Sequence, residues 1–280
     1  MSSAAEHYAA LLDAVEGQQL RLFGPRPADI WTGQSAAQFR FNPHRELDTN
    51  LAALASCIMP DDVVVDVGGG AGRVSLPLAF RCREVLTVEP SAGMAAEYEG
   101  SKRDAGITNA RLLPVSLMDA QGVEGDVAVT CDVTYFIRDI VPFIEKMQSV
   151  ARRRVMITVW SEPPPNRGAD LFRRVYGEPL APMPGHRELL PVLWDMGILP
   201  EVRVLPDPTW WEDWHYSTRE KAIESVIFGR WSREDVRDRA SSIFEEQFDE
   251  LFAPDGDGYR AIWRWPMQEL LITWETMRSV

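Results

Sequence analysis

The 280-residue chain has few cysteines, few histidines and no long apolar run. Cysteine occurs only at Cys57, Cys82 and Cys131, without a CxxC pair, and this odd number predicts no disulfide framework. A reducing, cytoplasmic compartment is therefore expected. The four histidines show no HxxH or HExxH pattern, so no metal site is predicted. No stretch is long enough to span a bilayer, and the N-terminus lacks the features of a secretory signal, so no membrane association is expected.

Positive charge is also in deficit, with 29 Lys and Arg against 42 Asp and Glu and a formal net charge of -13. Such a chain repels phosphate backbones and anionic membranes, so we expect no nucleic-acid partner and a small molecule as substrate. The densest basic run, Arg152–Arg154, is interpreted as a solvated helix end in preference to an anion site. Composition leaves the oligomeric state open.

Strand and helix patterns alternate through the middle of the chain. Val63–Val67 is β-branched and apolar apart from one acid, which is typical of a strand buried on both faces. Four more strands are predicted, at 85–89, 110–117, 126–131 and 155–160. A helix is predicted at 140–150. Five strands separated by helices or helix-length gaps predict an α/β fold, a Rossmann-like, doubly wound, mostly parallel sheet.

The rest of the chain is expected to decorate this sheet within a single domain. Residues 1–60 are predicted to form an N-terminal helical cap, with a helix from about Arg45, and residues 61–160 the ligand-binding core. Residues 161–280 are predicted to supply a lid, helical insertions and final strands. The predicted elements there are helices at 171–176, 188–196, 221–228 and 232–252, a strand at 202–205 and a long strand at 259–274 with a possible break at Pro266.

A glycine-rich turn follows the first predicted strand, in the run Asp66-Val67-Gly68-Gly69-Gly70-Ala71-Gly72. Glycines let the backbone turn tightly and approach a ligand closely, and a helix N-terminus beyond them offers free N–H groups. Glu89 ends the second strand, where an acid can accept hydrogen bonds from both hydroxyls of a ribose. The alternative for Glu89 is an acid that stabilises the start of the next helix. Together these features predict a nucleoside-binding site.

Two other nucleotide-binding patterns do not fit. The GxGxxG or GxGxxA fingerprint of dinucleotide-dependent oxidoreductases needs a small residue where Arg73 or Ser75 stands. A P-loop needs Gly-Lys-Ser or Gly-Lys-Thr after the glycine run, and neither is present. Both classes are therefore excluded.

The run from Val65 to Gly72 resembles the first motif of class I methyltransferases. The segment 88–91 followed by Met94 resembles their second motif, and segments 126–129 and 135–143 are similar to later ones. The resemblance covers about 63–160 and the helix before it. It implies S-adenosyl-L-methionine as the cofactor and methyl transfer as the reaction.

The resemblance also implies roles for single residues. The glycine turn would lie against the methionine and ribose portions, with Asp66 near the ammonium group or supporting the turn. Leu117 and Met118 would pack on the adenine ring or in plain core. The family often has an acid after the third strand that contacts the adenine amino group, but here the acid, Asp119, comes later in the sequence than that pattern. Asp132 would face the sulfonium or act as a turn acid. The predicted cofactor-binding residues are Asp66, Gly68, Gly69, Gly70, Gly72, Glu89, Leu117, Met118 and Asp132.

Acceptor contacts are predicted at Arg40, Arg45, Tyr135 and Trp160. The alternative for the arginines is a surface site and a helix start. An apolar pocket wall is expected from five tryptophans, with plain packing as the alternative: Trp31, Trp160, Trp210, Trp211 and Trp214. The sulfonium is already an activated donor, so no general base is required in every case and no catalytic residue is assigned. O-, N- and C-methylation stay open. The remaining alternatives are a non-catalytic S-adenosylmethionine-binding protein of the same fold and a protein methyltransferase.

Overall fold

The structure, a computed structural model, describes residues 3–206, 214–227, 233–263 and 267–276. It divides into two compact units by the contacts within each. Unit 1 comprises Met1–Ser161, Met183–Asp207 and Gln268–Val280, and unit 2 comprises Glu162–Pro182 and Pro208–Met267. Among the described residues, no helix has the length and apolar character required to cross a membrane.

Unit 1 is built on a seven-stranded sheet in the order β3-β2-β1-β4-β5-β10-β6. The first five strands run parallel, and β10 is antiparallel to both of its neighbours. The strands span Val63–Val67 (β1), Glu84–Val88 (β2), Ala110–Leu113 (β3), Gly125–Cys131 (β4), Ala151–Trp160 (β5), Glu201–Val204 (β6) and Glu269–Glu275 (β10). The doubly wound, mostly parallel sheet is confirmed, and its order reverses between β1 and β4, where ligands of such sheets bind.

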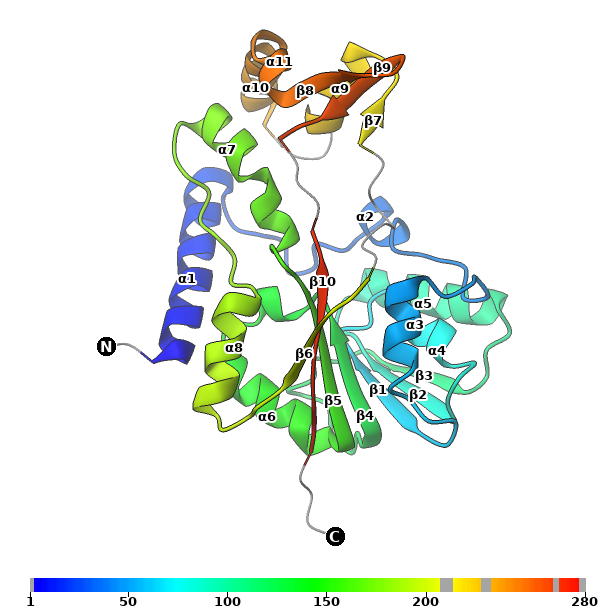
Figure 1. The fold of residues 1–280 in the computed structure, drawn as a ribbon. Coiled ribbons are helices and arrows are strands. Elements are labelled where there is room, and N and C mark those ends of the chain that lie inside the picture. The colour runs from blue at the N-terminus through cyan, green and yellow to red at the C-terminus, as the bar shows by residue number, and fades with distance from the viewer. Residues whose placement is uncertain (1–2, 207–213, 228–232, 264–266, 277–280) are drawn as a thin grey trace. The chain divides into compact units, whose positions relative to one another are not determined.

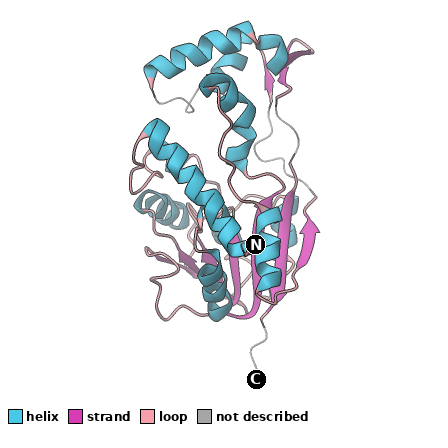
Figure 2. Ribbon diagram, turned by 90° about the vertical axis from the view of Figure 1, so that its left-hand side faces the viewer, coloured by secondary structure: helices cyan, strands magenta, loops and turns pink. Residues whose placement is uncertain are grey.

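Helices cover both faces of this sheet (Figures 1 and 2). Figure 1 shows α1, α6 and α8 on one face and α3, α4 and α5 on the other. Their bounds are Ala4–Phe23 (α1), Gln34–Ala37 (α2), Thr49–Ala55 (α3), Ser75–Leu78 (α4), Ala92–Asp104 (α5), Ile140–Val150 (α6) and His186–Asp195 (α8), and a 3₁₀ turn spans Thr134–Phe136. All five residues of β1 are buried, as a strand covered on both faces requires.

Several predicted boundaries were wrong. The third strand ends at Leu113, because residues 117–119 form a turn. The helix predicted from about Arg45 begins at Thr49, where the Asp48 side chain caps it by accepting from the backbone N–H of Leu51. The stretch 259–274 is not one strand: its two ends lie in different units and different sheets. Pro266, the predicted break, lies outside the described residues.

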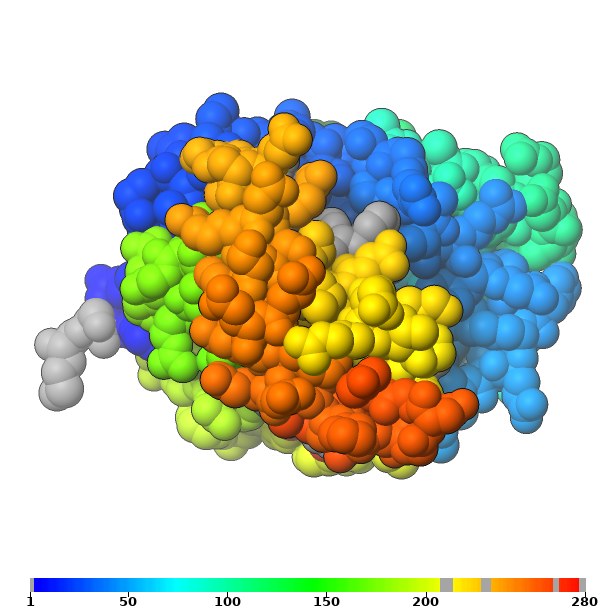
Figure 3. All heavy atoms as spheres, turned by 90° about the horizontal axis from the view of Figure 1, so that it is seen from above, coloured from blue at the N-terminus to red at the C-terminus, as the bar shows by residue number. Residues whose placement is uncertain are grey.

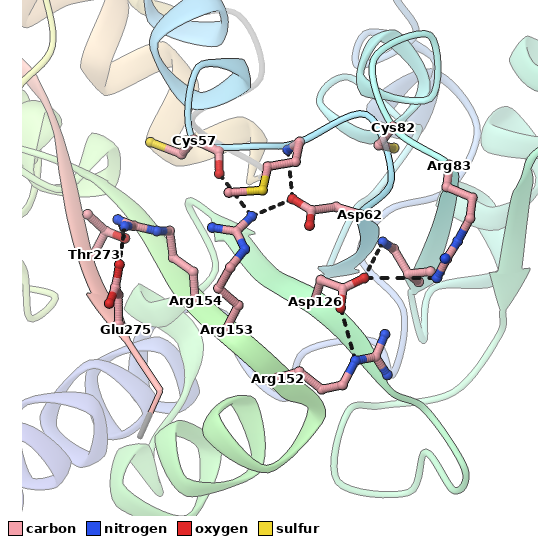
Figure 4. Close-up of polar contacts among 12 residues, drawn as sticks. Cys57, Asp62, Cys82, Arg83, Asp126, Arg152, Arg153, Arg154, Thr273 and Glu275 are labelled. Carbon is pink, nitrogen blue, oxygen red and sulfur yellow. Dashed lines mark hydrogen bonds and ion pairs between the residues drawn. The ribbon is translucent and has the colours of Figure 1, made fainter. Parts of the chain in front are cut away.

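The interpretation of Arg152–Arg154 as a solvated helix end was also wrong. α6 ends at Val150, and the three arginines belong to β5, where their guanidinium groups pair with carboxylates of neighbouring segments (Figure 4). Nε of Arg152 lies 3.0 Å from Oδ1 of Asp126, and Nη2 of Arg154 lies 3.1 Å from Oε1 of Glu275. Arg153 pairs with the buried Asp62. The run therefore fastens the amino end of β5 to its neighbours.

Unit 2 combines helices with a small antiparallel sheet in the order β7-β9-β8. Its elements are α7 (Ala169–Tyr176), α9 (Arg219–Ile227), α10 (Glu234–Glu246), α11 (Phe248–Leu251), β7 (His215–Tyr216), β8 (Phe252–Asp255), β9 (Gly258–Ala261) and a 3₁₀ turn at Pro164–Gly168. The predicted helix over 232–252 is thus two helices, and Phe252 begins a strand. The unit has its own core, which includes Leu171, Val226, Phe244 and Phe248. Figure 3 shows α9 (yellow) beside α10 (orange), and the two helices are in contact.

Candidate functional site

The glycine turn begins directly at the carboxyl end of β1. Gly68 has a φ of 69°, and its N–H donates to the carbonyl of Val88 at the end of β2. A Cβ atom on Gly68 would lie 2.6 Å from Cγ2 of Val133, and one on Gly69 would collide with Oδ2 of Asp66. The turn therefore requires glycine at both positions, for its backbone conformation or for close packing.

The other two glycines of the turn differ in their surroundings. A Cβ on Gly72 would lie 2.6 Å from Leu76, so Gly72 serves the close packing of the turn on α4. At Gly70 the nearest atom to such a Cβ is Sδ of Met94, 3.7 Å away. Gly70 also has a positive φ, 55°, so its N–H is presented by a backbone conformation that favours glycine.

Glu89 is joined to this turn by its side chain. Oε2 accepts from the N–H of Gly70 at 2.9 Å, and Oε1 accepts from the N–H of Ser91 at 2.7 Å. Burial raises the pKa of Glu89, while these two backbone donors oppose the shift. The carboxylate thus bridges the end of the glycine turn and the start of α5. Each oxygen retains the capacity to accept further hydrogen bonds from a ligand.

Asp66 lies beneath the turn and is 1% exposed. Its Oδ2 atom has no hydrogen-bond partner among the described residues. Burial raises the pKa of Asp66 to about 7; the nearby Ser75 hydroxyl and the charge of Arg73 oppose this shift, and the charge of Glu89 adds to it. A buried acceptor without a partner costs free energy, so such an atom in a native site points to a ligand, a proton or a strained function.

Asp132 and Arg73 face each other across the switch point. Asp132 follows β4 and is, among the described residues, the non-glycine residue with a positive φ, 63°. Its Oδ2 lies 3.1 Å from Nη2 of Arg73, the first charged residue after the glycine turn. Burial raises the pKa of Asp132 to about 7, and the Arg73 guanidinium opposes that shift. The pair places a positive and a negative group beside the ends of β1 and β4.

Arg45, one of the predicted acceptor residues, contacts the backbone of Arg73. Its Nη2 donates to the backbone carbonyl of Arg73 at 2.8 Å, and its guanidinium lies 5.2 Å from the ring centre of Phe41. Arg40 instead forms ion pairs with Glu97 and Asp104 on α5. Their predicted contact with an acceptor remains a prediction.

An N-terminal segment is held against the start of α5 by Asp29. The Asp29 carboxylate accepts hydrogen bonds from the Ser91 hydroxyl at 3.0 Å and from the N–H of Trp31 at 2.9 Å. A Cβ on Gly93 would collide with the carbonyl of Trp31, so the two backbones are in close contact. The hydrogen bonds that fix this segment therefore depend on a residue that the sequence analysis did not single out.

The same segment covers the glycine turn with aromatic rings. Trp31 and Phe39 pack edge to face, with ring centres 5.2 Å apart. Both contact a small cluster that contains Ala71 of the turn and Met94 of α5. The segment between 29 and 39 thus forms a wall at the glycine turn, as expected for a segment that covers a bound ligand.

The turn after β3 supplies the predicted adenine contacts. Leu117 is buried, whereas Met118 is 54% exposed and therefore available to a flat ligand. The Asp119 carboxylate accepts from the Ser116 hydroxyl at 2.6 Å. Their roles toward a cofactor remain predictions.

Tyr135 and Trp160 are both completely enclosed, at 1% and 0% exposure. The Tyr135 hydroxyl accepts from the backbone N–H of Trp160 and lies 3.5 Å from Oδ1 of Asp132. It therefore connects the ends of β4 and β5 beneath Asp132. Contact with an acceptor remains a prediction for both residues, and their burial fits a packing role.

Glu269 and Asn50 form a buried polar pair that the sequence analysis missed. Oε2 of Glu269 accepts from Nδ2 of Asn50 at 2.8 Å, and both residues are at most 5% exposed. The charge of Glu269 raises the pKa of Asp132, so the two acids are neighbours. Glu269 comes from β10, whose antiparallel pairing with β5 no local sequence pattern indicated.

No family model matches the chain. A segment of 57 residues, 20% of the chain, is 44% identical to a 23S rRNA (uracil(1939)-C(5))-methyltransferase, RlmD, of Aeromonas hydrophila, and covers 13% of that protein. The chain thus matches only a small part of this relative's length.

Solved structures resemble the chain over most of its length. A putative methyltransferase from Bacillus halodurans has a TM-score of 0.54 at 10% identity and covers 81% of this chain and 97% of its own. The YcgJ protein of Bacillus subtilis has a TM-score of 0.54 at 12% identity over 82% and 99%. An S-adenosylmethionine-dependent methyltransferase from Geobacter sulfurreducens, in complex with S-adenosylhomocysteine, has a TM-score of 0.50 at 15% identity over 87% and 98%.

Proposed function

We propose that this chain, which has the class I methyltransferase fold, binds S-adenosylmethionine and catalyses transfer of its methyl group to a small-molecule acceptor. The observation that carries the proposal is the joint position of Glu89 and Gly70, with a carboxylate and a glycine turn in contact at the ends of β1 and β2. A nucleoside at this edge of the sheet can donate hydrogen bonds from both of its ribose hydroxyls to the Glu89 carboxylate.

The residues present fit this cofactor. The Glu89 carboxylate supplies acceptors for the ribose, and Gly70 has space beside it, since the nearest atom to a Cβ there would be Sδ of Met94 at 3.7 Å. Met118 offers an exposed apolar side chain for the adenine ring, and the wall formed by Trp31 and Phe39 shields the turn. Asp66 supplies a buried oxygen without a partner among the described residues.

Arg73 and Asp132 suit the amino-acid end of the cofactor, which carries one carboxylate and one ammonium group. The guanidinium can donate to the carboxylate, and the Asp132 carboxylate can accept from the ammonium. In the present structure the two side chains satisfy each other. Each would exchange this contact for the ligand group of opposite charge, so the charges of the site stay balanced.

When bound, the sulfonium supplies an already activated methyl donor, so the chain's residues mainly have to align an acceptor and exclude water. The net charge of -13 favours a small acceptor over a polyanion such as RNA. The match to the rRNA methyltransferase covers too little of that protein to favour RNA here. The acceptor atom is left open, because Asp132 with its raised pKa could accept a proton from a nucleophile but does not have to.

Transfer of a radiolabelled methyl group from S-adenosylmethionine tests the proposal. The purified chain would be incubated with panels of phenols, amines and carboxylic acids, and in parallel with denatured protein and total RNA. Label in a small molecule supports the proposal. Label in protein or RNA would show that the acceptor is a macromolecule and contradict the proposed small-molecule acceptor. Cofactor binding without transfer to any of these acceptors would support the non-catalytic alternative.

A further inference from the structure

The strand β6 forms one edge of the seven-stranded sheet, and Figure 1 shows it as the outermost strand beside β10. In the part of the chain that the structure describes, β6 pairs with β10 alone. Val202 and Val204 are 41% and 62% exposed, so this edge combines a free row of backbone groups with apolar side chains. Proteins usually cover such an edge, because it can pair with another strand.

The hydrogen-bond register shows which backbone groups are free. Leu205 donates its N–H to the carbonyl of Glu269, and the residues of β6 pair with β10 in order before it. Because hydrogen-bonded pairs alternate along an antiparallel ladder, Arg203 and Glu201 point their backbone groups toward β10. Val202 and Val204 therefore point their N–H and carbonyl groups outward, away from the sheet.

The charged side chains of β6 are complementary to a second copy of the same strand. Glu201 and Arg203 share a face of the strand and form an ion pair, with Nε and Oε1 3.4 Å apart. If a second copy of β6 pairs in antiparallel orientation with Val202 opposite Val202, each Glu201 lies opposite Arg203 of the other copy. The charges then alternate around a square, so that each charge has an opposite charge beside it along its own strand and across the interface.

Symmetric registers centred on either charged residue of β6 are worse. Centring the pair on Arg203 or on Glu201 places like charges opposite each other, which is destabilising. Centring on Val202 also uses the outward groups: the two Val202 residues exchange both hydrogen bonds, and each Val204 N–H meets the carbonyl of Pro200 in the other copy. On the opposite face, Val202 and Val204 of both copies form one apolar row.

From this self-complementary pattern we infer that β6 is a homodimer interface, through which two copies join their sheets by antiparallel pairing centred on Val202. The interaction is isologous, with the same surface used by both copies. The strand has only four residues, so the interface is small and we expect a dimer that dissociates on dilution. The inference does not depend on the proposed enzymatic activity.

Charge reversal tests the interface. Sedimentation velocity of the full chain over a concentration series should show a monomer–dimer equilibrium. E201R and R203E should each raise the dimer dissociation constant about tenfold or more, because like charges then face each other. An equimolar mixture of the two variants should restore dimers, since every cross-strand pair in the mixed dimer is again of opposite charge.

The opposite edge of the sheet provides the matched control. Glu84 of β2 and Arg111 of β3 form an exposed cross-strand pair 2.8 Å apart, and E84R and R111E make the same charge changes there. These variants should leave the dimer unchanged. A wild-type chain that stays monomeric throughout the series, dimers that persist in both E201R and R203E, or a mixture of these variants that remains monomeric would each overturn the inference.

Discussion

Arg73 and Asp132 form an ion pair, Nη2 to Oδ2 3.1 Å, that joins the turn after β1 to the turn after β4. The pair lies where the strand order reverses, which is where open α/β sheets bind ligands. Both side chains are about one-fifth exposed, so they are accessible to a ligand and yet partly removed from water. Their opposite charges match the two charges of an amino-acid group.

Replacing Arg73 by Gln should weaken binding of S-adenosylmethionine by about 1.5–3 kcal/mol, the range for a hydrogen bond to a charged group. The matched ligand is methylthioadenosine, which has the same nucleoside but no amino-acid end. Its affinity should change little in Arg73→Gln, as measured by calorimetric titration. Equal losses for both ligands would mean that the pair only supports the turn.

Glu89→Ala should weaken both of these ligands, because each contains the ribose. The expected loss is about 1.5–3 kcal/mol for charge-assisted hydrogen bonds. Glu84→Ala is the control, since Glu84 lies at the other end of β2 and pairs with Arg111 on the surface. If Glu89→Ala binds both ligands as tightly as the wild type, the role of Glu89 is limited to stabilising the start of α5 and accepting the hydrogen bond from the N–H of Gly70.

Asp66 should make the folded state less stable as the pH rises. Its pKa is raised from 3.8 to about 7 by burial, so the folded chain holds a proton that the unfolded chain releases. Its contribution is complete below pH 3.8 and is lost between pH 3.8 and about 7, with a slope of at most about 1.4 kcal/mol per pH unit. Denaturant unfolding of Asp66→Asn across this window should show a shallower decline than the wild type. Parallel curves would show that Asp66 is ionised in the folded chain.

Tyr135→Phe should lower the free energy of unfolding by about 1–3 kcal/mol, because the buried N–H of Trp160 loses its acceptor. Turnover of the folded enzyme should change little if Tyr135 only packs. A large loss of turnover at an unchanged melting temperature would instead support the prediction that Tyr135 contacts the acceptor.

The local part of the site was predictable from the sequence because strands and turns carry local signals. The first strand, its glycine turn and Glu89 at the end of the second strand each carry a local signal, and together they predict a nucleoside-binding site at the ends of β1 and β2. The central sheet followed from alternation of strands and helices, and the exact bounds of α6 from its apolar periodicity.

Contacts between distant segments were not predictable in this way. Glu269 reaches the neighbourhood of Asp132 only through the pairing of β10 with β5, and Asp29 reaches Ser91 only through the fold of the N-terminal segment. Arg73 carried one signal, its place as the first charge after the glycines, but its pairing with Asp132 depends on the neighbouring positions of β1 and β4. Trp210 and Trp211, expected near the acceptor, lie outside the described residues.

Calorimetric titration of the wild-type chain with S-adenosylhomocysteine and, separately, with NAD tests the central claim most directly. S-adenosylhomocysteine, the cofactor after loss of its methyl group, retains the ribose and the amino-acid end, so it should bind at one site per chain. NAD should show no comparable binding. Tighter binding of NAD, or no binding of S-adenosylhomocysteine, would contradict the assignment of this glycine turn and Glu89 to S-adenosylmethionine.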